Sequence, residues 1–355
     1  MNLLKIYFLK INLAQILRPI IAVFIGLILG LSLTLFAGEN PWRVFLVLMQ
    51  SGFGSFYDFG MVLSYSAPLI LTGLSVAFAY HCGLFNIGAE GQLTMGALGT
   101  AVFCALVPLP SFIAPVAAMF IAGMSGGIWG FFAGYLKAKR GAHEVITTIM
   151  LNFIAAGIAS FVAVYVLKDP NSQNPQTVPI LPQYVLHSFP FFQGAPLTSS
   201  LFLSIFASLV FYFFLYKTPK GFEIRAVGEN INSSYTSGIH VQKIQILSMF
   251  ISGVFSGLVG VGEVLGRSYS FKLDFSPGYG FTGIAVAFLA KGNPIGIIFS
   301  GLLFGLLTKG SGDLEIFSSK ITSDLSLILQ GMIILIVSSD GLWDLLKFKK
   351  KGLSA

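Results

Sequence analysis

One carboxyl group in the sequence lies where a charged group is costly. Glu90 falls within the stretch GLFNIGAEGQ at positions 83–92, inside an apolar run. A carboxylate at the centre of a membrane-spanning helix costs at least ~2.5 kcal/mol on insertion scales, so it is usually functional or paired. Asn86 shares a helix face with Glu90 if this stretch is helical, and Gln92 is close by. The pattern predicts either a polar element that lines a transport path or a structural cluster of hydrogen bonds that holds a broken helix.

Other polar positions in apolar runs are weaker candidates. Asn152 is predicted mainly as a hydrogen-bonding contact between helices, with substrate contact as the alternative. Glu263 and Arg267 are four residues apart, which predicts an ion pair on one helix face near the end of a span. Glu263 is therefore interpreted as an interfacial structural residue rather than a catalytic one.

The motifs do not support enzyme chemistry. His143-Glu144 begins a zinc-protease pattern, but Thr147 stands where the second His is required. The sequence contains no Gly-x-x-x-x-Gly-Lys-Ser/Thr loop for binding ATP. The four His are scattered, and the two Cys, Cys82 and Cys104, form no ligand pattern. We therefore expect no catalytic residues, no metal and no cofactor bound by this chain.

The composition indicates which elements must position these groups. Of the 355 residues, 55% are hydrophobic and 10% are charged, whereas a typical soluble domain carries about 25% charged residues. This excludes a water-soluble enzyme and predicts an all-α membrane protein. A helix needs roughly 20 residues to cross the hydrocarbon core, and we predict about ten spans, in the apolar runs at 19–37, 59–80, 84–107, 111–136, 145–167, 199–216, 244–266, 273–290, 294–308 and 324–342.

The distribution of basic residues predicts the topology. Ten spans place both termini on one side, together with 15 of the 21 Lys and Arg residues. The other side carries six, namely Arg43, Lys168, Arg267, Lys272, Lys309 and Lys320. Because basic residues accumulate on the cytoplasmic side, we expect both termini there. The run at 19–37 is interpreted as an anchor rather than a signal peptide, since it is long and lacks a good cleavage signal.

The ten predicted spans can be divided into two five-helix halves, and we expect these halves to have inverted orientations, as in many transporters. The third span begins in residues 83–92, and the eighth contains PGYGFTGIA at positions 277–285. Both are interrupted by Gly and are poor as continuous helices. Broken helices in equivalent positions of two halves indicate a translocation path. We find no separate soluble domain, so residues 1–355 are expected to form a single polytopic transmembrane domain.

Two loops differ in character. The outer loop at 168–198 is rich in Pro, Asn and Gln and is predicted to be an exposed connection. In the inner loop at 217–243, Asn230 or Asn232 is predicted to cap a short helix that Gly238 ends. Such a helix suits the docking of a soluble partner, and a solvated linker is the alternative.

Three segments together resemble the permease subunits of ATP-binding-cassette (ABC) importers, in the branch that includes branched-chain amino acid, ribose and nucleoside permeases. Residues 83–92 are similar to the Asn-Ile-Gly-x-Glu-Gly-Gln signature of the nucleoside, or simple-sugar, permeases. Residues 144–152 resemble the fifth span of the family. Residues 221–238 resemble its cytoplasmic loop, which inserts a coupling helix into the ATPase; the matching positions are Gly221, Arg225, Ala226, Gly228, Asn230 and Gly238.

The resemblance implies an importer in the cell (inner) membrane of a prokaryote. The implied partners are a second homologous permease subunit, a cytosolic ABC ATPase that uses ATP-Mg, an external substrate-binding protein or lipoprotein, and membrane lipid, but no nucleic acid. The implied solute is a nucleoside, which needs a stacking ring and hydrogen-bonding groups. The candidates for the substrate path are Asn86, Glu90, Gln92, Asn152 and Phe281.

Other classes of membrane protein remain as alternatives. An ion-coupled secondary transporter of a small polar solute would need intramembrane carboxyl groups, for which Glu90 and Glu263 are available. An intramembrane enzyme is disfavoured because no catalytic constellation is evident. A scaffold protein has no use for broken helices.

Overall fold

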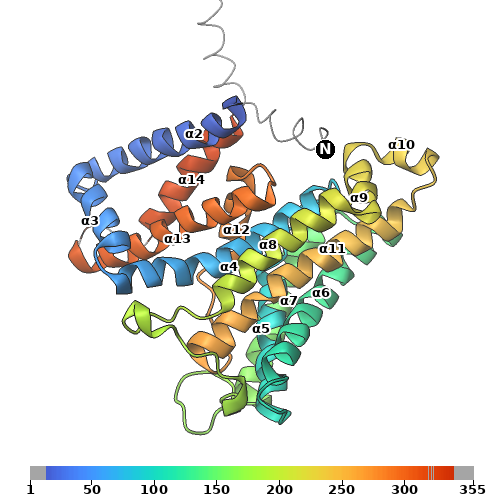
Figure 1. Cartoon of the computed structure of the whole chain (residues 1–355), viewed down its shortest axis with the longest axis horizontal. Helices are drawn as coiled ribbons and strands as arrows, with labels where there is room; N and C mark the ends of the chain where they lie inside the picture. The colour runs from blue at the N-terminus through green and yellow to red at the C-terminus, as the bar shows by residue number, and fades with distance from the viewer. Residues whose placement is uncertain (1–12, 319, 321, 323, 340–355) are drawn as a thin grey trace, which may run out of the picture. The chain divides into compact units, whose positions relative to one another are not determined.

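The computed structural model describes residues 13–318, 320, 322 and 324–339, and the regular structure of these residues is helical apart from two isolated β-bridges (Figure 1). Two π-helical segments, η2 (Val162–Val166) and η5 (Val261–Ser268), extend α7 and follow α11. The α-helices are α2 (Leu13–Ser32), α3 (Pro41–Phe53), α4 (Phe56–Tyr80), α5 (Ala89–Leu106), α6 (Ala114–Arg140), α7 (Glu144–Phe161), α8 (Ser200–Lys217), α9 (Pro219–Glu229), α10 (Ile231–Thr236), α11 (Val241–Gly257), α12 (Tyr279–Leu289), α13 (Pro294–Phe317) and α14 (Leu325–Ser338).

Six described helices are long and apolar enough to cross a membrane: α4, α6, α7 with η2, α8, α11 with η5, and α13. Shorter apolar helices lie in α2, α12 and α14. Each predicted apolar run contains a helix, and the prediction of an all-helical membrane fold is confirmed. The ten-span count and the cytoplasmic side of the termini stay predictions. The terminal basic residues Lys5, Lys10, Lys347, Lys349, Lys350 and Lys351 lie outside the described residues.

One described helix lies where the sequence predicted a connection. α3 occupies the stretch between the first two apolar runs and contains Arg43 and Trp42. Unlike α2, α12 and α14, α3 is neither one of the six span-length helices nor one of the shorter apolar helices among the described residues.

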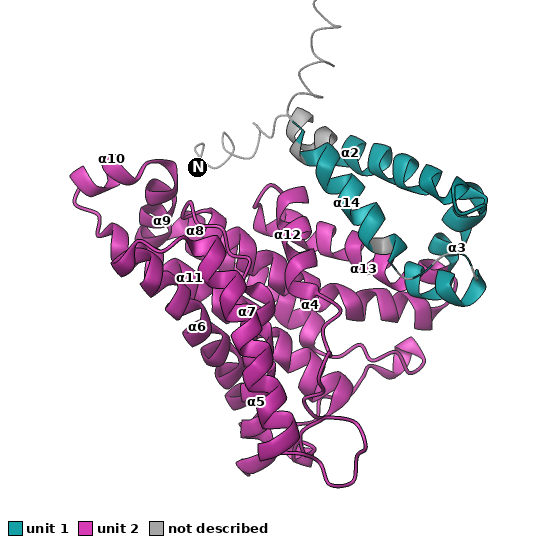
Figure 2. Cartoon of the chain, turned by 180° about the vertical axis from the view of Figure 1, so that it is seen from behind, with its two compact units in different colours: residues 1–50, 310–355 teal, residues 51–309 magenta. Residues whose placement is uncertain are grey.

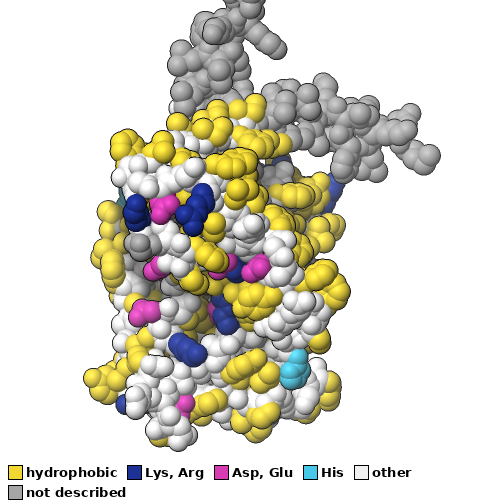
Figure 3. Space-filling model, turned by 90° about the vertical axis from the view of Figure 1, so that its left-hand side faces the viewer, with side chains coloured by type: hydrophobic (Ala, Val, Ile, Leu, Met, Phe, Trp, Pro, Cys, Tyr) yellow, Lys and Arg dark blue, Asp and Glu magenta, His cyan; other side chains and the backbone are white. Residues whose placement is uncertain are grey.

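The outward-facing side chains are those expected of helices in lipid. Phe153 of α7 and Phe299 of α13 are each 69% exposed, and Phe206 and Phe213 of α8 are similarly open. Figure 3 shows hydrophobic side chains over much of one face and charged ones in only a few places. Extended apolar surface of this kind is rare on soluble proteins but is solvated well by hydrocarbon.

The chain forms two compact units, residues 1–50 with 310–355 and residues 51–309 (Figure 2). In the first unit, α2 packs along α14. Gly26 and Gly30 of α2 face Ile333 and Leu329 of α14, and an added Cβ at either glycine would collide with those residues. Small residues on α2 therefore permit the close packing of this helix pair.

α4 is the central helix of the second unit. Most of its length is buried, and α12, α11 and α8 pack around it. Two of its buried hydroxyl groups bond to the helix itself: Ser66 donates to the Val62 carbonyl at 2.7 Å and Thr72 to the Pro68 carbonyl at 3.0 Å. These bonds satisfy polar groups that have no water available to them in the core of a membrane protein.

Glycines allow α6, α11 and α5 to cross closely, and Figure 1 shows α6 and α11 side by side. A Cβ at Gly253 of α11 would meet the carbonyl oxygen of Gly126 on α6, and the converse also holds. A Cβ at Gly96 of α5 would likewise meet the backbone of Gly257 on α11. Backbone contact through small residues is a common way for membrane helices to associate.

The outer loop at 168–198 is partly buried, so the prediction of an exposed connection is wrong for its middle. Tyr184 is fully buried, and its hydroxyl donates to the Val107 carbonyl at 2.8 Å. The Leu181 N–H donates to the Cys104 carbonyl at 3.0 Å, and the Leu186 N–H to the Leu265 carbonyl at 2.8 Å. The loop packs here because helix ends leave carbonyl groups without a partner.

We expect Gly253→Leu to destabilise the protein by about 1–3 kcal/mol through overpacking. The obstructing group is the Gly126 backbone, which cannot move aside as a flexible side chain would. Thermal unfolding in detergent should show a lower midpoint. Gly157→Leu is the matched control, because Gly157 is also helical and an added Cβ there meets nothing within 4 Å. Equal midpoints for the two variants would contradict the expectation.

Candidate functional site

The two broken helices begin beside each other. α5 starts at Ala89 after non-helical residues 84–88, and α12 starts at Tyr279 after a similar non-helical approach. Glu90 Oε2 accepts a hydrogen bond from the Gly280 N–H at 2.7 Å. This bond satisfies one of the donors that a helix start leaves unpaired, and the helix dipole favours an acidic group at this position.

Gly280 makes this approach possible. A Cβ at Gly280 would collide with the backbone of Glu90 and Ala89. Gly278 has a φ of +86°, a left-handed conformation that glycine adopts without strain, and it turns the chain into α12. The glycines that interrupt the two spans therefore permit backbone contact between two helix starts.

Asn86 and Glu90 do not share a helix face, because Asn86 precedes the helix. Its side chain is buried with those of Gln92, Ser75 and Ser252, and we call these four residues the polar cluster. Asn86 Nδ2 donates to Ser252 Oγ at 2.7 Å and to Gln92 Oε1 at 2.9 Å. Asn86 Oδ1 accepts from the Gly88 N–H at 2.9 Å. The cluster thus joins α4, α5 and α11 to the non-helical segment.

Asn152 of α7 holds the same segment through its backbone. Its Oδ1 accepts from the Gly91 N–H at 2.8 Å, and its Nδ2 donates to the Ile87 carbonyl at 3.0 Å. Both ends of the amide are therefore bonded to the start of the broken helix. This geometry is that of the predicted contact between helices.

The structure separates the predicted path residues into two groups. Asn86 and Gln92 are 0% and 1% exposed, and their polar atoms bond within the protein. Phe281 is 52% exposed and directly follows Gly280, the residue that Glu90 contacts. The open part of the site is therefore the start of α12 beside Glu90, and the buried residues hold that part in place.

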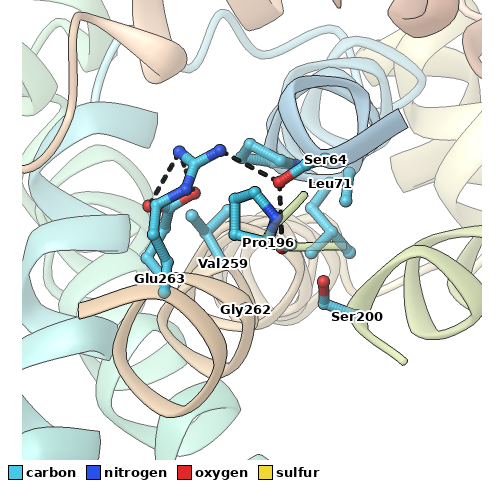
Figure 4. Close-up of a pocket in the computed structure, with 10 residues that line it drawn as sticks. Ser64, Leu71, Pro196, Ser200, Val259, Gly262 and Glu263 are labelled. Atoms are coloured by element: carbon cyan, nitrogen blue, oxygen red, sulfur yellow. Dashed lines mark hydrogen bonds and ion pairs between the residues drawn. The ribbon is translucent and has the colours of Figure 1, made fainter. Parts of the chain in front are cut away.

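The predicted ion pair forms and belongs to a larger network (Figure 4). Arg267 Nη1 lies 3.3 Å from Glu263 Oε1 and donates to the Tyr279 hydroxyl at 3.1 Å. Arg267 Nη2 donates to Ser64 Oγ at 3.0 Å, and Ser64 donates to the Pro196 carbonyl at 3.1 Å. Glu263 is buried within the protein, and the position of the pair near the membrane interface stays a prediction. The network connects η5, α4 and the outer loop to the first residue of α12.

The inner loop at 217–243, which we call the coupling segment, is more helical than the sequence predicted. Thr218 caps α9 by accepting from the Gly221 N–H at 3.0 Å. Asn230 caps α10 by accepting from the Ser233 N–H at 3.0 Å. Gly238, with a φ of +82°, follows the end of α10. The predicted short helix from Asn230 to Gly238 is confirmed, whereas α9 was not expected.

The two helices of the coupling segment differ in their surroundings. α9 packs on α8, with the Arg225 guanidinium 5.2 Å from the centre of the Tyr216 ring. α10 carries exposed apolar side chains, with Ile231 51% and Tyr235 75% exposed. α9 thus contacts the membrane helices, and α10 exposes apolar side chains on its surface.

His81 was not singled out by the sequence, yet it lies between the coupling segment and α12. Its Nε2 is 3.0 Å from the Gly292 carbonyl oxygen, which can only accept, so this nitrogen carries the proton. Burial, and secondarily the positive charge of Arg225, lower the pKa of His81 below its usual range, although the bond to Gly292 opposes this. The neutral ring is therefore the form that this environment favours.

Sequence reasoning missed several other contributors to the site. Ser75 and Ser252 complete the polar cluster, and Ser64 and Tyr279 complete the Arg267 network. Serine and tyrosine are common in membrane helices and carry no spacing signal. The only available signal was the position of Tyr279 within the Gly-interrupted span.

Comparison with known proteins gives a consistent result. The model of the family described as "Branched-chain amino acid transport system / permease component" matches residues 59–338. The chain is 36% identical to the guanosine ABC transporter permease protein NupP of Bacillus subtilis (strain 168), over 96% of this chain and 99% of that protein. It is 34% identical to the nucleoside ABC transporter permease protein NupB of Lactococcus lactis, over 84% of each chain.

A third relative is the glucose ABC transporter permease protein TsgB13 of Haloferax volcanii, 30% identical over 89% of this chain and 85% of that protein. No solved structure matches the chain. Three findings point to the same class of protein: the span-length helices of this chain, the polar residues at the starts of its two broken helices, and the matches over most of its length. The chain belongs to the family of ABC permease components described for branched-chain amino acid transport systems, and it is a membrane transport subunit rather than an enzyme.

Proposed function

We propose that nucleosides are the solutes that this permease carries into the cell. The observation that carries this proposal is the similarity to a guanosine permease over nearly the whole of both chains. A second nucleoside permease matches over most of its length. The exposed Phe281 ring supplies a surface for stacking, and it directly follows Gly280, which bonds to the Glu90 carboxyl group; an aromatic ring and a polar group near one helix start suit a nucleobase with its polar edge.

The partners proposed are those that an ABC permease requires. They are a second homologous permease subunit, a cytosolic ABC ATPase that hydrolyses ATP-Mg, and an external substrate-binding protein or lipoprotein. Two different permeases from Bacillus subtilis, NupP and NupQ, both match this chain, and so do NupB and NupC from Lactococcus lactis. These matched pairs support a heterodimer of related permeases.

The proposed topology gives ten crossings with both termini in the cytoplasm. α2, α5, α12 and α14 are added to the six long spans, while α3, α9 and α10 do not cross. The coupling segment then faces the ATPase, and the outer loop at 168–198 faces the binding protein. ATP drives the cycle only through its different affinity for the two conformations of the transporter.

Glucose is the second candidate solute, because the chain is 30% identical to a glucose permease over most of both chains. An ion-coupled secondary transporter is not favoured. Family membership points to an ATPase partner, and Glu263, one of the two carboxyl groups that ion coupling would use, is already paired with Arg267.

The solute is tested by uptake of radiolabelled guanosine into cells that express the complete transporter. We expect uptake that requires the ATPase and that unlabelled adenosine, uridine or cytidine reduces by competition, with glucose as the contrasting competitor. Strong competition by glucose without competition by nucleosides would transfer the assignment to a sugar. Uptake that persists after loss of the ATPase would favour a secondary transporter.

The topology is tested by cysteine labelling with a membrane-impermeant maleimide in a Cys82→Ala, Cys104→Ala background. Tyr235→Cys, in the exposed α10, should react only when the cytoplasmic side is accessible. Gln173→Cys, in the outer loop, should react in intact cells and serves as the matched control for the external side. Labelling of position 235 in intact cells would contradict the coupling role of the segment.

The Glu90 contact is tested by comparing Glu90→Ala with Glu90→Gln. Loss of a hydrogen bond to a charged group costs about 1.5–3 kcal/mol, so the Ala variant should assemble but lose at least about tenfold in uptake, which corresponds to ~1.4 kcal/mol. The Gln variant keeps an acceptor for the Gly280 N–H and should retain more uptake. An Ala variant that does not assemble would make Glu90 a structural residue.

A further inference from the structure

The turn after α4 touches the coupling segment directly. A Cβ at Gly228, near the end of α9, would collide with the His81 carbonyl group and the Gly83 nitrogen. A Cβ at Gly83, which has a φ of +70°, would lie 3.3 Å from Gly228 Cα. Backbone therefore packs on backbone at this point, and a displacement of α9 must displace the turn.

A second chain of contacts joins α9 to the same residue through side chains. The Arg225 guanidinium lies over the Tyr216 ring of α8, and the Tyr216 ring lies edge-on to the His81 ring, with centroids 6.3 Å apart. The His81 ring also contacts Phe211 of α8, with centroids 6.0 Å apart. His81 is thus held to α9 by its backbone and, through α8, by its ring.

The His81 ring continues the contact to the other broken helix. Its Nε2–H donates to the Gly292 carbonyl at 3.0 Å. Gly292 has a φ of +71° and lies in the turn directly after α12, where an added Cβ would be 3.3 Å from Nε2. This hydrogen bond is a direct polar link between the turn after α4 and the turn after α12.

Both turns lead to the open part of the site. The turn after α4 runs through Asn86 into α5, and the turn at Gly292 ends α12. The starts of α5 and α12 are themselves joined by the Glu90–Gly280 bond. The contacts therefore close a ring that runs from α9 through His81 to α12, across to α5, and back to the turn that α9 touches.

We propose that His81 is a positioning residue for transport, which passes the movement of α9 to α5 and α12 together through its backbone contact with Gly228 and its hydrogen bond to Gly292. This inference rests on the proposed function of the coupling segment. It assigns to His81 a role in conformational coupling and no contact with the solute. Without the hydrogen bond, α9 would still move the turn before α5, but α12 would lose its direct polar link to that turn and would follow more weakly, through the Glu90–Gly280 bond.

The test compares two substitutions that separate the ring from its hydrogen bond. His81→Phe keeps an aromatic ring against Phe211 and Tyr216 but loses the N–H, whereas His81→Gln keeps an N–H donor and loses the ring. His143→Ala is the control, since His143 is an exposed histidine just before α7. Each variant is purified as the complete transporter and reconstituted in lipid vesicles.

One readout does not depend on the identity of the solute. Phe281→Cys, on the exposed face of α12, is placed in the Cys82→Ala, Cys104→Ala background, and its rate of maleimide labelling is measured with and without trapping of ATP by vanadate. We expect trapping to change the labelling rate with native His81, with His81→Gln and with His143→Ala. The His81→Phe variant should show a change at least threefold smaller, although its basal ATP hydrolysis stays within twofold.

The second readout is the amount of solute taken up per ATP hydrolysed, which should fall at least tenfold in His81→Phe and recover in His81→Gln. A normal labelling response in His81→Phe, or no response with native His81, would overturn the proposal. A loss in both His81→Phe and His81→Gln would also overturn it, because the hydrogen bond would not be the active feature. Failure of native transporter to take up nucleosides while the labelling pattern holds would count against the proposed solute only.

Discussion

The structure depends on one constraint of the membrane, which is that a backbone N–H or carbonyl group must find its partner inside the protein. Continuous helices such as α6 meet this constraint by themselves. The two interrupted segments do not, because α5 and α12 begin only after non-helical residues. Side chains must therefore supply the missing partners, and Glu90, Asn86 and Asn152 each bond to a backbone group there.

This arrangement explains why polar residues gather around so short a stretch. The polar cluster and Asn152 fix the segment that precedes α5. Asn86 donates to Gln92 within the cluster, and both ends of the Asn152 amide are bonded to backbone groups. Glu90 and Arg267 act on the start of α12 from different sides, through Gly280 and Tyr279. The two broken helices are thus supported by side chains from α4, α7, α11 and η5, so movement of those helices is transmitted to the open part of the site.

The contacts that connect the membrane helices to the coupling segment are of a different kind. Around α9 the contacts are between backbones, at Gly228 and Gly83, and between rings, at Tyr216 and His81. Packed contacts of this kind resist compression and transmit small displacements. Between the turn after α4 and the turn after α12 the contact includes a directional hydrogen bond, that of His81 to Gly292.

The sequence by itself determined the helical membrane fold, the positions of the apolar helices, the two interrupted spans, the capped helix of the coupling segment and the family. These follow from hydropathy, from the conformational preferences of Gly and Asn, and from local motifs, all of which act within one stretch of chain. Only the tertiary structure decided that Glu90 bonds to Gly280, that Asn86 bonds to Ser252, and that the outer loop is partly buried. Those contacts join residues far apart in sequence, and a serine hydroxyl or a glycine N–H becomes informative only when folding brings a partner within about 3 Å.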